Sequence, residues 1–167
     1  GGELVAVTTE GPHGAEVPAA VLAVGDTAYV ESAQACGLHL SKGEAGDFAT
    51  SAGVGALLIA AAATGARRVV VGLGGAGSND GGAGLLGALG ARADRVLEGG
   101  AILLHGLGEI DISLCHSVIG GVELVAATDV DIPLTGLFGT TKAFGARRGI
   151  GETRLADTDA FLEQYAA

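Results

Sequence analysis

A glycine-rich segment that carries three polar residues is the strongest chemical signal in the sequence. It reads Gly72-Leu73-Gly74-Gly75-Ala76-Gly77-Ser78-Asn79-Asp80-Gly81-Gly82. Glycine lets a backbone approach a ligand closely, and successive N–H groups at a helix start can bind an anion. Asp80 could hold Mg²⁺ or accept a hydroxyl proton, as phosphoryl transfer requires. We therefore predict a phosphate or substrate site here, although a tight strand-to-helix turn capped by Asn79 and Asp80 is the structural alternative.

A second candidate site lies where an apolar stretch ends in acids. Residues 122–128 are predicted to form a buried strand, and Asp129 and Asp131 follow it. Open α/β sheets bind ligands outside the carboxyl ends of their strands. Strand alternation would place both carboxylates on one side, where they could share a cation. The alternative is a pair of solvated acids that opens a turn before Pro133.

Cations gather in a second glycine-rich segment, predicted as a loop over residues 135–151. Lys142, Arg147 and Arg148 lie in it, although the whole chain has only 9 lysines and arginines. Arginine forks suit carboxylate or phosphate recognition. The alternative is a solvated loop tip. Glu31, at the end of a short predicted strand, is a weaker site candidate.

The order of apolar patterns predicts an α/β fold with a mixed sheet. Residues 3–9 and 17–24 are expected to pair as an antiparallel hairpin, and a strand over 27–31 follows a Gly25-Asp26 turn. A helix is expected from residue 50 or 51 to about residue 64, then a short buried strand over 69–71. Residues 39–47 are expected to form a loop, residues 85–89 a helix, and residues 153–167 an amphipathic helix.

Composition limits the possible functions. The chain has 167 residues, and 9 Lys and Arg against 19 Asp and Glu give a formal charge of −10, which argues against nucleic-acid or anionic membrane partners. The uncharged stretch 48–66 is rich in Ala, Gly, Thr and Ser, so a buried helix is preferred to a membrane span. Two cysteines cannot build a disulfide framework. We expect one α/β domain over residues 1–167, a piece of a longer protein because the chain contains no Met, and a cytoplasmic location.

The glycine segment also contains a literal dinucleotide fingerprint. Gly72, Gly74 and Gly77 match G-x-G-x-x-G, and Glu98 follows about 20 residues later. In that fingerprint the helix begins near the second glycine, which would put Gly81 and Gly82 into its first turns at a cost in stability. An NAD-binding Rossmann domain is therefore the third and weakest interpretation.

The motifs together resemble bacterial glycerate kinases of the type-1 family. The resemblance rests on Thr9-Glu10-Gly11-Pro12-His13-Gly14, Val30-Glu31-Ser32-Ala33, Gly74-Gly75-Ala76-Gly77-Ser78-Asn79-Asp80-Gly81-Gly82, residues 129–136 and Phe144-Gly145-Ala146-Arg147-Arg148-Gly149. It implies one domain of a two-domain α/β kinase that transfers the γ-phosphoryl of ATP to D-glycerate with Mg²⁺. Asp80 and Asp129 would then be the catalytic acids and tentative Mg²⁺ ligands. Phosphate and substrate would be bound by Gly74, Gly75, Ser78, Asn79, Gly81, Gly82, Arg147, Arg148 and Glu31.

A non-catalytic relative is the main alternative. Ala52 and Ala56 stand where the family has Tyr and Glu, and Arg147 replaces its Gln. These replacements suit a binding or assembly domain that kept the fold and lost the chemistry. A homodimer is also left open by the sequence.

Overall fold

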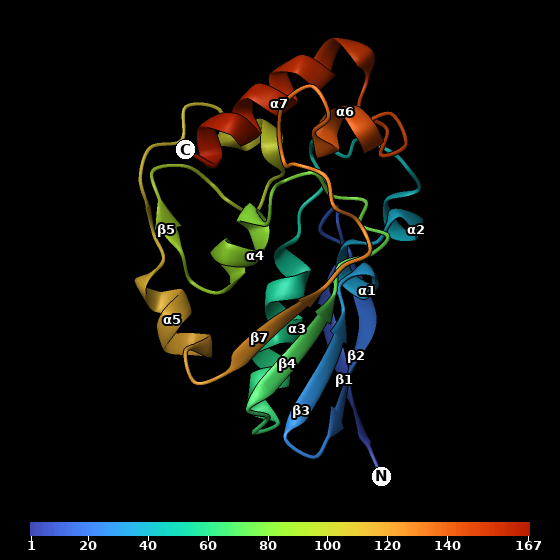
Figure 1. Cartoon of the computed structure of the whole chain (residues 1–167), viewed down its shortest axis with the longest axis vertical. Coiled ribbons are helices and arrows are strands. Elements are labelled where there is room, and N and C mark those ends of the chain that lie inside the picture. The colour runs from blue at the N-terminus through green and yellow to red at the C-terminus, as the bar shows by residue number, and fades with distance from the viewer.

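The computed structural model describes residues 1–167 and is built around a five-stranded mixed sheet (Figure 1). The sheet strands, in the spatial order β1-β2-β3-β4-β7, are β1 (Glu3–Glu10), β2 (Glu16–Val24), β3 (Thr27–Glu31), β4 (Arg68–Gly72) and β7 (Glu123–Ala127). A separate pair joins β5 (Arg92–Ala93) to β6 (Ile110–Asp111). The helices are α1 (Ala33–Cys36), α2 (Leu38–Ser41), α3 (Ala52–Ala63), α4 (Ala83–Ala88), α5 (Ser113–Ile119), α6 (Thr140–Phe144) and α7 (Glu152–Tyr165), with a 3₁₀ turn η1 (Ala101–Leu104).

The predicted amino-terminal hairpin is confirmed. β1 and β2 pair antiparallel from Glu3 opposite Ala23 to Glu10 opposite Glu16. β2 then pairs antiparallel with β3, through a turn in which Gly25 has a φ of +60°. β3, β4 and β7 run parallel to one another, so their carboxyl ends meet at one edge of the sheet. The predicted mixed α/β class with a hairpin is therefore correct.

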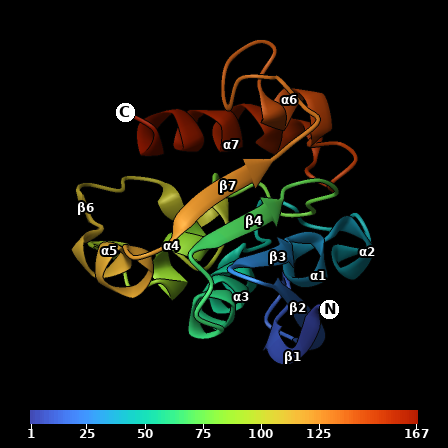
Figure 2. The ribbon, with the colours of Figure 1, turned by 60° about the horizontal axis from the view of Figure 1, so that its bottom comes forward.

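Helix α3 packs on one face of the sheet (Figure 2) and supplies much of the core. Leu57 and Ala61 are fully buried on it, as are Val21 and Val69 on the sheet. A side chain at position 53 would collide with the carbonyl oxygen of Glu10, so this close approach needs glycine. The stretch 48–66 thus contains a buried helix, as predicted. None of the helices is both long enough and apolar enough to cross a membrane.

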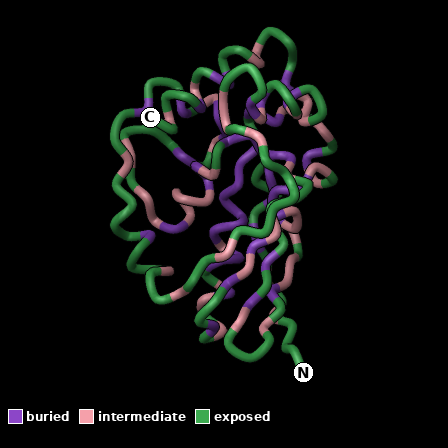
Figure 3. Tube along the Cα trace, viewed as in Figure 1, coloured by how far each residue is buried: buried purple, intermediate pink, exposed green.

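The prediction that residues 122–128 are buried is wrong. β7 pairs only with β4 and forms the edge of the sheet. Most of its residues are exposed (Figure 3). Leu124 is among them. The apolar residues of β7 match the pattern of an inner strand, but burial requires layers packed over both faces of the sheet, and this edge strand is not covered in that way.

Two segments predicted as loops contain short helices. α2 includes His39, and its first residue is fixed by a hydrogen bond from the Leu38 N–H to the Gly75 carbonyl, 2.8 Å long. α6 lies inside the segment 135–151, and the Thr140 hydroxyl at its start donates to the Leu134 carbonyl at 2.9 Å. Both helices depend on contacts with the surrounding fold, which apolar periodicity does not reveal.

A second apolar cluster holds the carboxy-terminal layer in place. Leu162 of α7 packs with Leu104 and Leu107, and Leu162 and Leu104 are fully buried. α6 and α7 thereby lie across the end of the molecule toward which β4 and β7 point (Figure 1). This arrangement places the second glycine-rich segment opposite the first.

Candidate functional site: a cleft between the two glycine-rich segments

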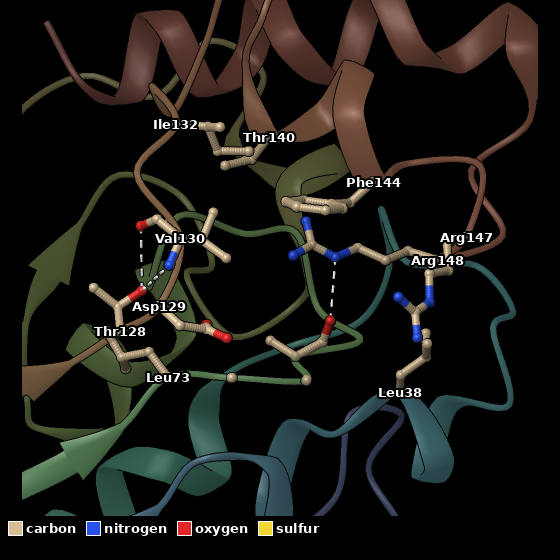
Figure 4. Close-up of a pocket in the computed structure, with 13 residues that line it drawn as sticks. Leu38, Leu73, Thr128, Asp129, Val130, Ile132, Thr140, Phe144, Arg147 and Arg148 are labelled. Carbon is tan, nitrogen blue, oxygen red and sulfur yellow. Dashed lines mark hydrogen bonds between the residues drawn. The ribbon is translucent and has the colours of Figure 1, made fainter.

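A cleft of about 450 Å³ opens at the carboxyl ends of β4 and β7 (Figure 4). One wall is the segment after β4, the second is the segment after β7, and the third comes from α6 and the residues that follow it. The lining residues are Leu38, Leu73, Gly74, Gly75, Ala76, Thr128, Asp129, Val130, Ile132, Thr140, Phe144, Arg147 and Arg148. The cleft therefore lies where open α/β sheets bind their ligands.

The first half of the glycine loop leaves backbone donors free. The N–H groups of Gly74, Gly75 and Ala76 donate to no acceptor in the protein. The loop is held by its other groups: the Gly75 carbonyl accepts from Leu38, and the Gly77 N–H donates to the Cys36 carbonyl at 2.7 Å. Gly75 has a φ of +72°, a conformation that favours glycine. Successive free N–H groups on a fixed loop can bind an anion.

Arg148 faces this loop across the cleft. Its Nε–H donates to the Ala76 carbonyl at 3.2 Å, and its Nη1–H donates to Oδ1 of Asn79 at 2.5 Å. The guanidinium lies 5.4 Å from the centre of the Phe144 ring, and Figure 4 shows it pointing into the cavity beneath that ring. Burial lowers its pKa, yet arginine stays charged in proteins. No carboxylate forms an ion pair with it.

Asn79 lies behind Arg148 and does not line the cleft. It is 4% exposed, and its Nδ2 amide donates to the hydroxyl of Thr141 on α6 at 2.9 Å. Both ends of the amide are thus engaged, one by the guanidinium and one by α6. This side chain joins the glycine loop to the opposite wall.

The Asp80 carboxylate is buried under the loop, 2% exposed, and saturated with donors. Its Oδ2 accepts from the backbone and hydroxyl of Ser51, both at 2.8 Å, and from the Gly84 N–H at 3.2 Å. Its Oδ1 accepts from the Gly82 N–H at 3.2 Å. The carboxylate therefore joins the starts of α3 and α4, and it is not among the groups that line the cleft.

The expectation that Ser78, Gly81 and Gly82 lie beside a ligand is not matched by the cleft, which none of them lines. Ser78 is buried. Gly81 and Gly82 have φ values of +61° and +85° and turn the chain into α4. Gly74 and Gly75, in contrast, line the cleft.

The two acids that follow β7, Asp129 and Asp131, have different surroundings. Asp129 lines the cleft, and its carboxylate takes part in no hydrogen bond or ion pair. Asp131 does not line it. The strand ends at Ala127, and the Thr128 hydroxyl bonds to Val130, so strand alternation does not continue through both acids. No three or more His, Cys, Asp or Glu side chains gather as a metal-binding cluster.

Of the remaining residues predicted to form the site, one lines the cleft and two do not. Arg147 is exposed and lines the cleft. Lys142 pairs instead with Asp159 at 3.0 Å. Glu31 ends β3 outside the cleft, where it accepts a long bond of 3.4 Å from the Ala33 N–H.

Sequence reasoning missed several residues that build the site. Thr141 holds the Asn79 amide, Phe144 covers the Arg148 guanidinium, and Ser51 holds Asp80. Ser51 directly precedes α3, but its side chain does not cap that helix. The neighbouring Thr50 hydroxyl accepts from the Ala52 N–H at 3.1 Å instead.

The geometry needed by the dinucleotide interpretation is absent. The helix after the glycines begins at Ala83, well beyond Gly74. Glu98 lies in a turn and does not follow a strand. A nicotinamide cofactor would lack both the early helix start and the acid for its ribose.

Comparison with known proteins gives one consistent result. The glycerate kinase family model matches residues 1–167. A glycerate kinase of Bacillus subtilis is 37% identical over 99% of this chain and 45% of its own length. A glycerate 2-kinase of Escherichia coli is 36% identical over 93% of this chain and 43% of its own.

A solved structure supports the same assignment. A protein from Salmonella typhimurium LT2, assigned as glycerate kinase 2, superposes with a TM-score of 0.92 at 34% identity. The match covers 99% of this chain and 47% of that one, so this chain spans about half the length of the relatives it matches. The resemblance expected from the motifs is confirmed, and the chain belongs to the glycerate kinase family.

Proposed function

We propose that this chain provides the anion-binding part of a kinase site that transfers the γ-phosphoryl of ATP to D-glycerate. The observation that carries the proposal is Arg148, a partly buried guanidinium with no carboxylate partner on the wall of a cleft. Buried charges in proteins are normally paired. An oxyanion in the cleft would pair this charge and also accept from the free N–H groups of Gly74 and Gly75.

Each wall of the cleft would then have one task. Arg148, together with the exposed Arg147, would bind phosphate or carboxylate oxygens, and the Phe144 ring would cover the Arg148 guanidinium. The loop N–H groups would orient the same anion. Positioning and charge stabilisation of this kind make up most of phosphoryl-transfer catalysis.

Asp129 fits a magnesium ion better than Asp80 does. Mg²⁺ in kinase sites is held by one or two carboxylates together with water and substrate phosphates. Asp129 offers a free carboxylate on the cleft, whereas both oxygens of Asp80 already accept hydrogen bonds. When bound, Mg²⁺ would stabilise negative charge on the phosphate oxygens. We propose that Asp129 holds the ion or accepts the hydroxyl proton, and that Asp80 positions the loop.

The test is an ADP-release assay on the protein in its full natural length, with ATP, Mg²⁺ and D-glycerate. ADP release that depends on D-glycerate is the expected result, and the product shows which hydroxyl is phosphorylated. Binding of ATP or D-glycerate without turnover would favour the non-catalytic alternative, which Ala52 and Ala56 motivate. No binding of either would overturn the proposal. The cytoplasmic location and a homodimer stay predictions.

Two neighbouring acids provide a matched pair of variants. Asp129→Asn should lower kcat by at least about 100-fold, the scale of losing a general base or a metal ligand. Asp131→Asn makes the same change on an acid that does not line the cleft, and should leave kcat within about twofold. Both acids are exposed, so neither change should affect folding. Equal losses in the two variants would remove Asp129 from the proposed site.

A further inference from the structure

We infer that Asn79 is a positioning residue that fixes Arg148 while leaving its positive charge unneutralised, so that the charge is available to an oxyanion. The inference rests on the proposed function, because it concerns the ligand of the same cleft. The family resemblance implies that Asn79 binds phosphate or substrate directly, but its side chain is buried and does not line the cleft, so a positioning role is a different assignment.

The first step is geometric. A guanidinium has five N–H groups. In Arg148 the Nε–H is used by the Ala76 carbonyl and an Nη1–H by Oδ1 of Asn79. Both acceptors lie on the glycine loop, so the guanidinium is fixed against the same segment whose free N–H groups line the cleft. The remaining N–H groups can bind a ligand.

The second step concerns the orientation of the amide. Nδ2 of Asn79 donates to the Thr141 hydroxyl, and Thr141 is fully buried. Because Nδ2 is the donor in that bond, Oδ1 must face Arg148. Thr141 belongs to α6, which also carries the Phe144 ring that covers the guanidinium. One side chain therefore sets the distance between the loop and α6 and orients the arginine between them.

The third step concerns charge. Arginines in protein interiors commonly pair with a carboxylate, which binds the fork in bidentate fashion and cancels its charge. The Asn79 amide has the same shape as a carboxylate, but it accepts one hydrogen bond from Arg148 and does not cancel the positive charge. A ligand oxyanion then does not compete with an internal carboxylate for Arg148. The choice of Asn over Asp at position 79 thus favours anion affinity over the stability of the empty protein.

The ligand is an oxyanion, either a phosphate of ATP or the carboxylate of D-glycerate. Three probes separate these sources when titrated by calorimetry into the full-length protein: inorganic pyrophosphate, ATP with Mg²⁺, and D-glycerate. If substitution of Asn79 weakens the binding of pyrophosphate and ATP only, Arg148 is assigned to the phosphates. If the substitution weakens the binding of D-glycerate only, Arg148 is assigned to the substrate carboxylate.

The decisive variant is Asn79→Asp, which keeps the shape of the side chain and adds a charge. Its Kd for the affected probe should rise by at least about tenfold, the scale of one charge-assisted hydrogen bond. Its Tm should stay at or above that of the wild type, because Arg148 gains an internal partner. If Asn79 had a purely structural role, the affinity would fall only in a variant whose Tm also falls.

A matched control is available on α7. Gln164→Glu is also an amide-to-acid change, and its amide donates to the Leu107 carbonyl at 3.2 Å, outside the cleft. It should leave the Kd of every probe within about twofold. Equal Kd values for Asn79→Asp and Gln164→Glu would overturn the inference while leaving the proposed function intact. A wild-type protein that binds none of the three probes would overturn both.

A neutral pair of variants keeps the test decisive if Asn79→Asp folds poorly. Asn79→Ala releases Arg148, so the KM of the affected substrate should rise by at least about fivefold. Gln164→Ala removes an amide that lies outside the cleft, so KM should stay within about twofold even if Tm falls. Equal KM values in these two variants would overturn the inference.

Discussion

Two arginines of this protein stack on phenylalanine rings, and they have different partners. Arg148 lies 5.4 Å from the centre of the Phe144 ring, and Arg154 lies 5.5 Å from that of Phe48. Arg154 forms an ion pair with Asp47, whose side chain is fully buried. Arg148 is held by the amide of Asn79 and has no carboxylate partner. The same residue type on the same kind of ring is thus neutralised in one place and left charged in the other.

The difference separates a structural cation from a cation that is free to bind a ligand. The pair of Arg154 and Asp47 joins α7 to the segment before α3, and it leaves no charge for a ligand. Arg148 lines the cleft beside unused N–H groups and forms no ion pair within the protein, so it can pair with a ligand anion. A count of cations in the sequence cannot distinguish Arg148 from Arg154. The two differ only in the residues that they contact.

The largest effect is expected when Arg154 is removed. Arg154→Met should lower the free energy of unfolding by about 3–5 kcal/mol, since it leaves a fully buried carboxylate without its cation. The other oxygen of Asp47 has no hydrogen-bond partner that could compensate. Urea unfolding measures the loss. A loss below about 1 kcal/mol would mean that Arg154 is not structural and would remove the contrast with Arg148.

The pH dependence of stability tests whether water is excluded from the interior behind Arg148 and the glycine loop. Cys36 lies behind the glycine loop, and burial raises the pKa of its thiol from 9.0 to about 11. Between these values the unfolded chain loses the thiol proton while the native protein keeps it. The native state then binds more protons, so the free energy of unfolding falls as pH rises from about 9 to 11, by about 2–3 kcal/mol.

The control is the same pH series on Cys36→Ala, which should lack this contribution to the fall. The quantity to compare is the difference between the two urea-unfolding curves at each pH. A difference that stays constant from pH 9 to 11 would show that water reaches the thiol, and that the interior behind Arg148 is not sealed.

The sequence predicted the elements whose signals are local. The alternation in β1 and β2 predicted the hairpin, the turn at Gly25 predicted the passage into β3, and the long apolar segment predicted α3. It did not predict α2 and α6, because helices of four and five residues depend on contacts from elsewhere. It also misjudged β7, since an apolar pattern cannot show whether other elements cover the faces of a strand.

The glycine loop singled out in the sequence lines the candidate cleft, but its polar residues Asn79 and Asp80 do not. Asp80, however, is held by Ser51, 29 positions earlier in the chain, and no local pattern links the two. The two adjacent arginines also look equivalent in sequence. They differ because Asn79, 69 positions before Arg148, fixes that arginine and leaves Arg147 exposed.

A reciprocal change at the structural arginine sharpens the comparison. Asp47→Asn converts the Arg154 site to the chemistry of the Arg148 site, an arginine bound to an amide. It should lower the free energy of unfolding by about 2 kcal/mol, because the charge-assisted bond weakens and Arg154 loses its counter-charge. Thermal and urea unfolding measure the change. An unchanged stability would mean that an amide and a carboxylate are equivalent partners here, and the argument from Asn79 would lose its basis.

The smallest effect on stability is expected at Arg148 itself. Arg148→Met keeps an unbranched side chain that can still cover the Phe144 ring, and it removes a charge that is partly buried without a carboxylate. Relief from that charge offsets the lost hydrogen bonds to Asn79 and Ala76, so the free energy of unfolding should change by no more than about 1 kcal/mol. The affinity for pyrophosphate, ATP or D-glycerate should nevertheless fall by at least about tenfold, since the variant has lost the cation of the cleft. Arg92→Met is the matched control, because Arg92 is exposed on β5 and lies outside the cleft. If Arg148→Met loses as much stability as Arg154→Met and binds its ligands as well as the control, Arg148 is structural and the cleft needs another anion-binding group.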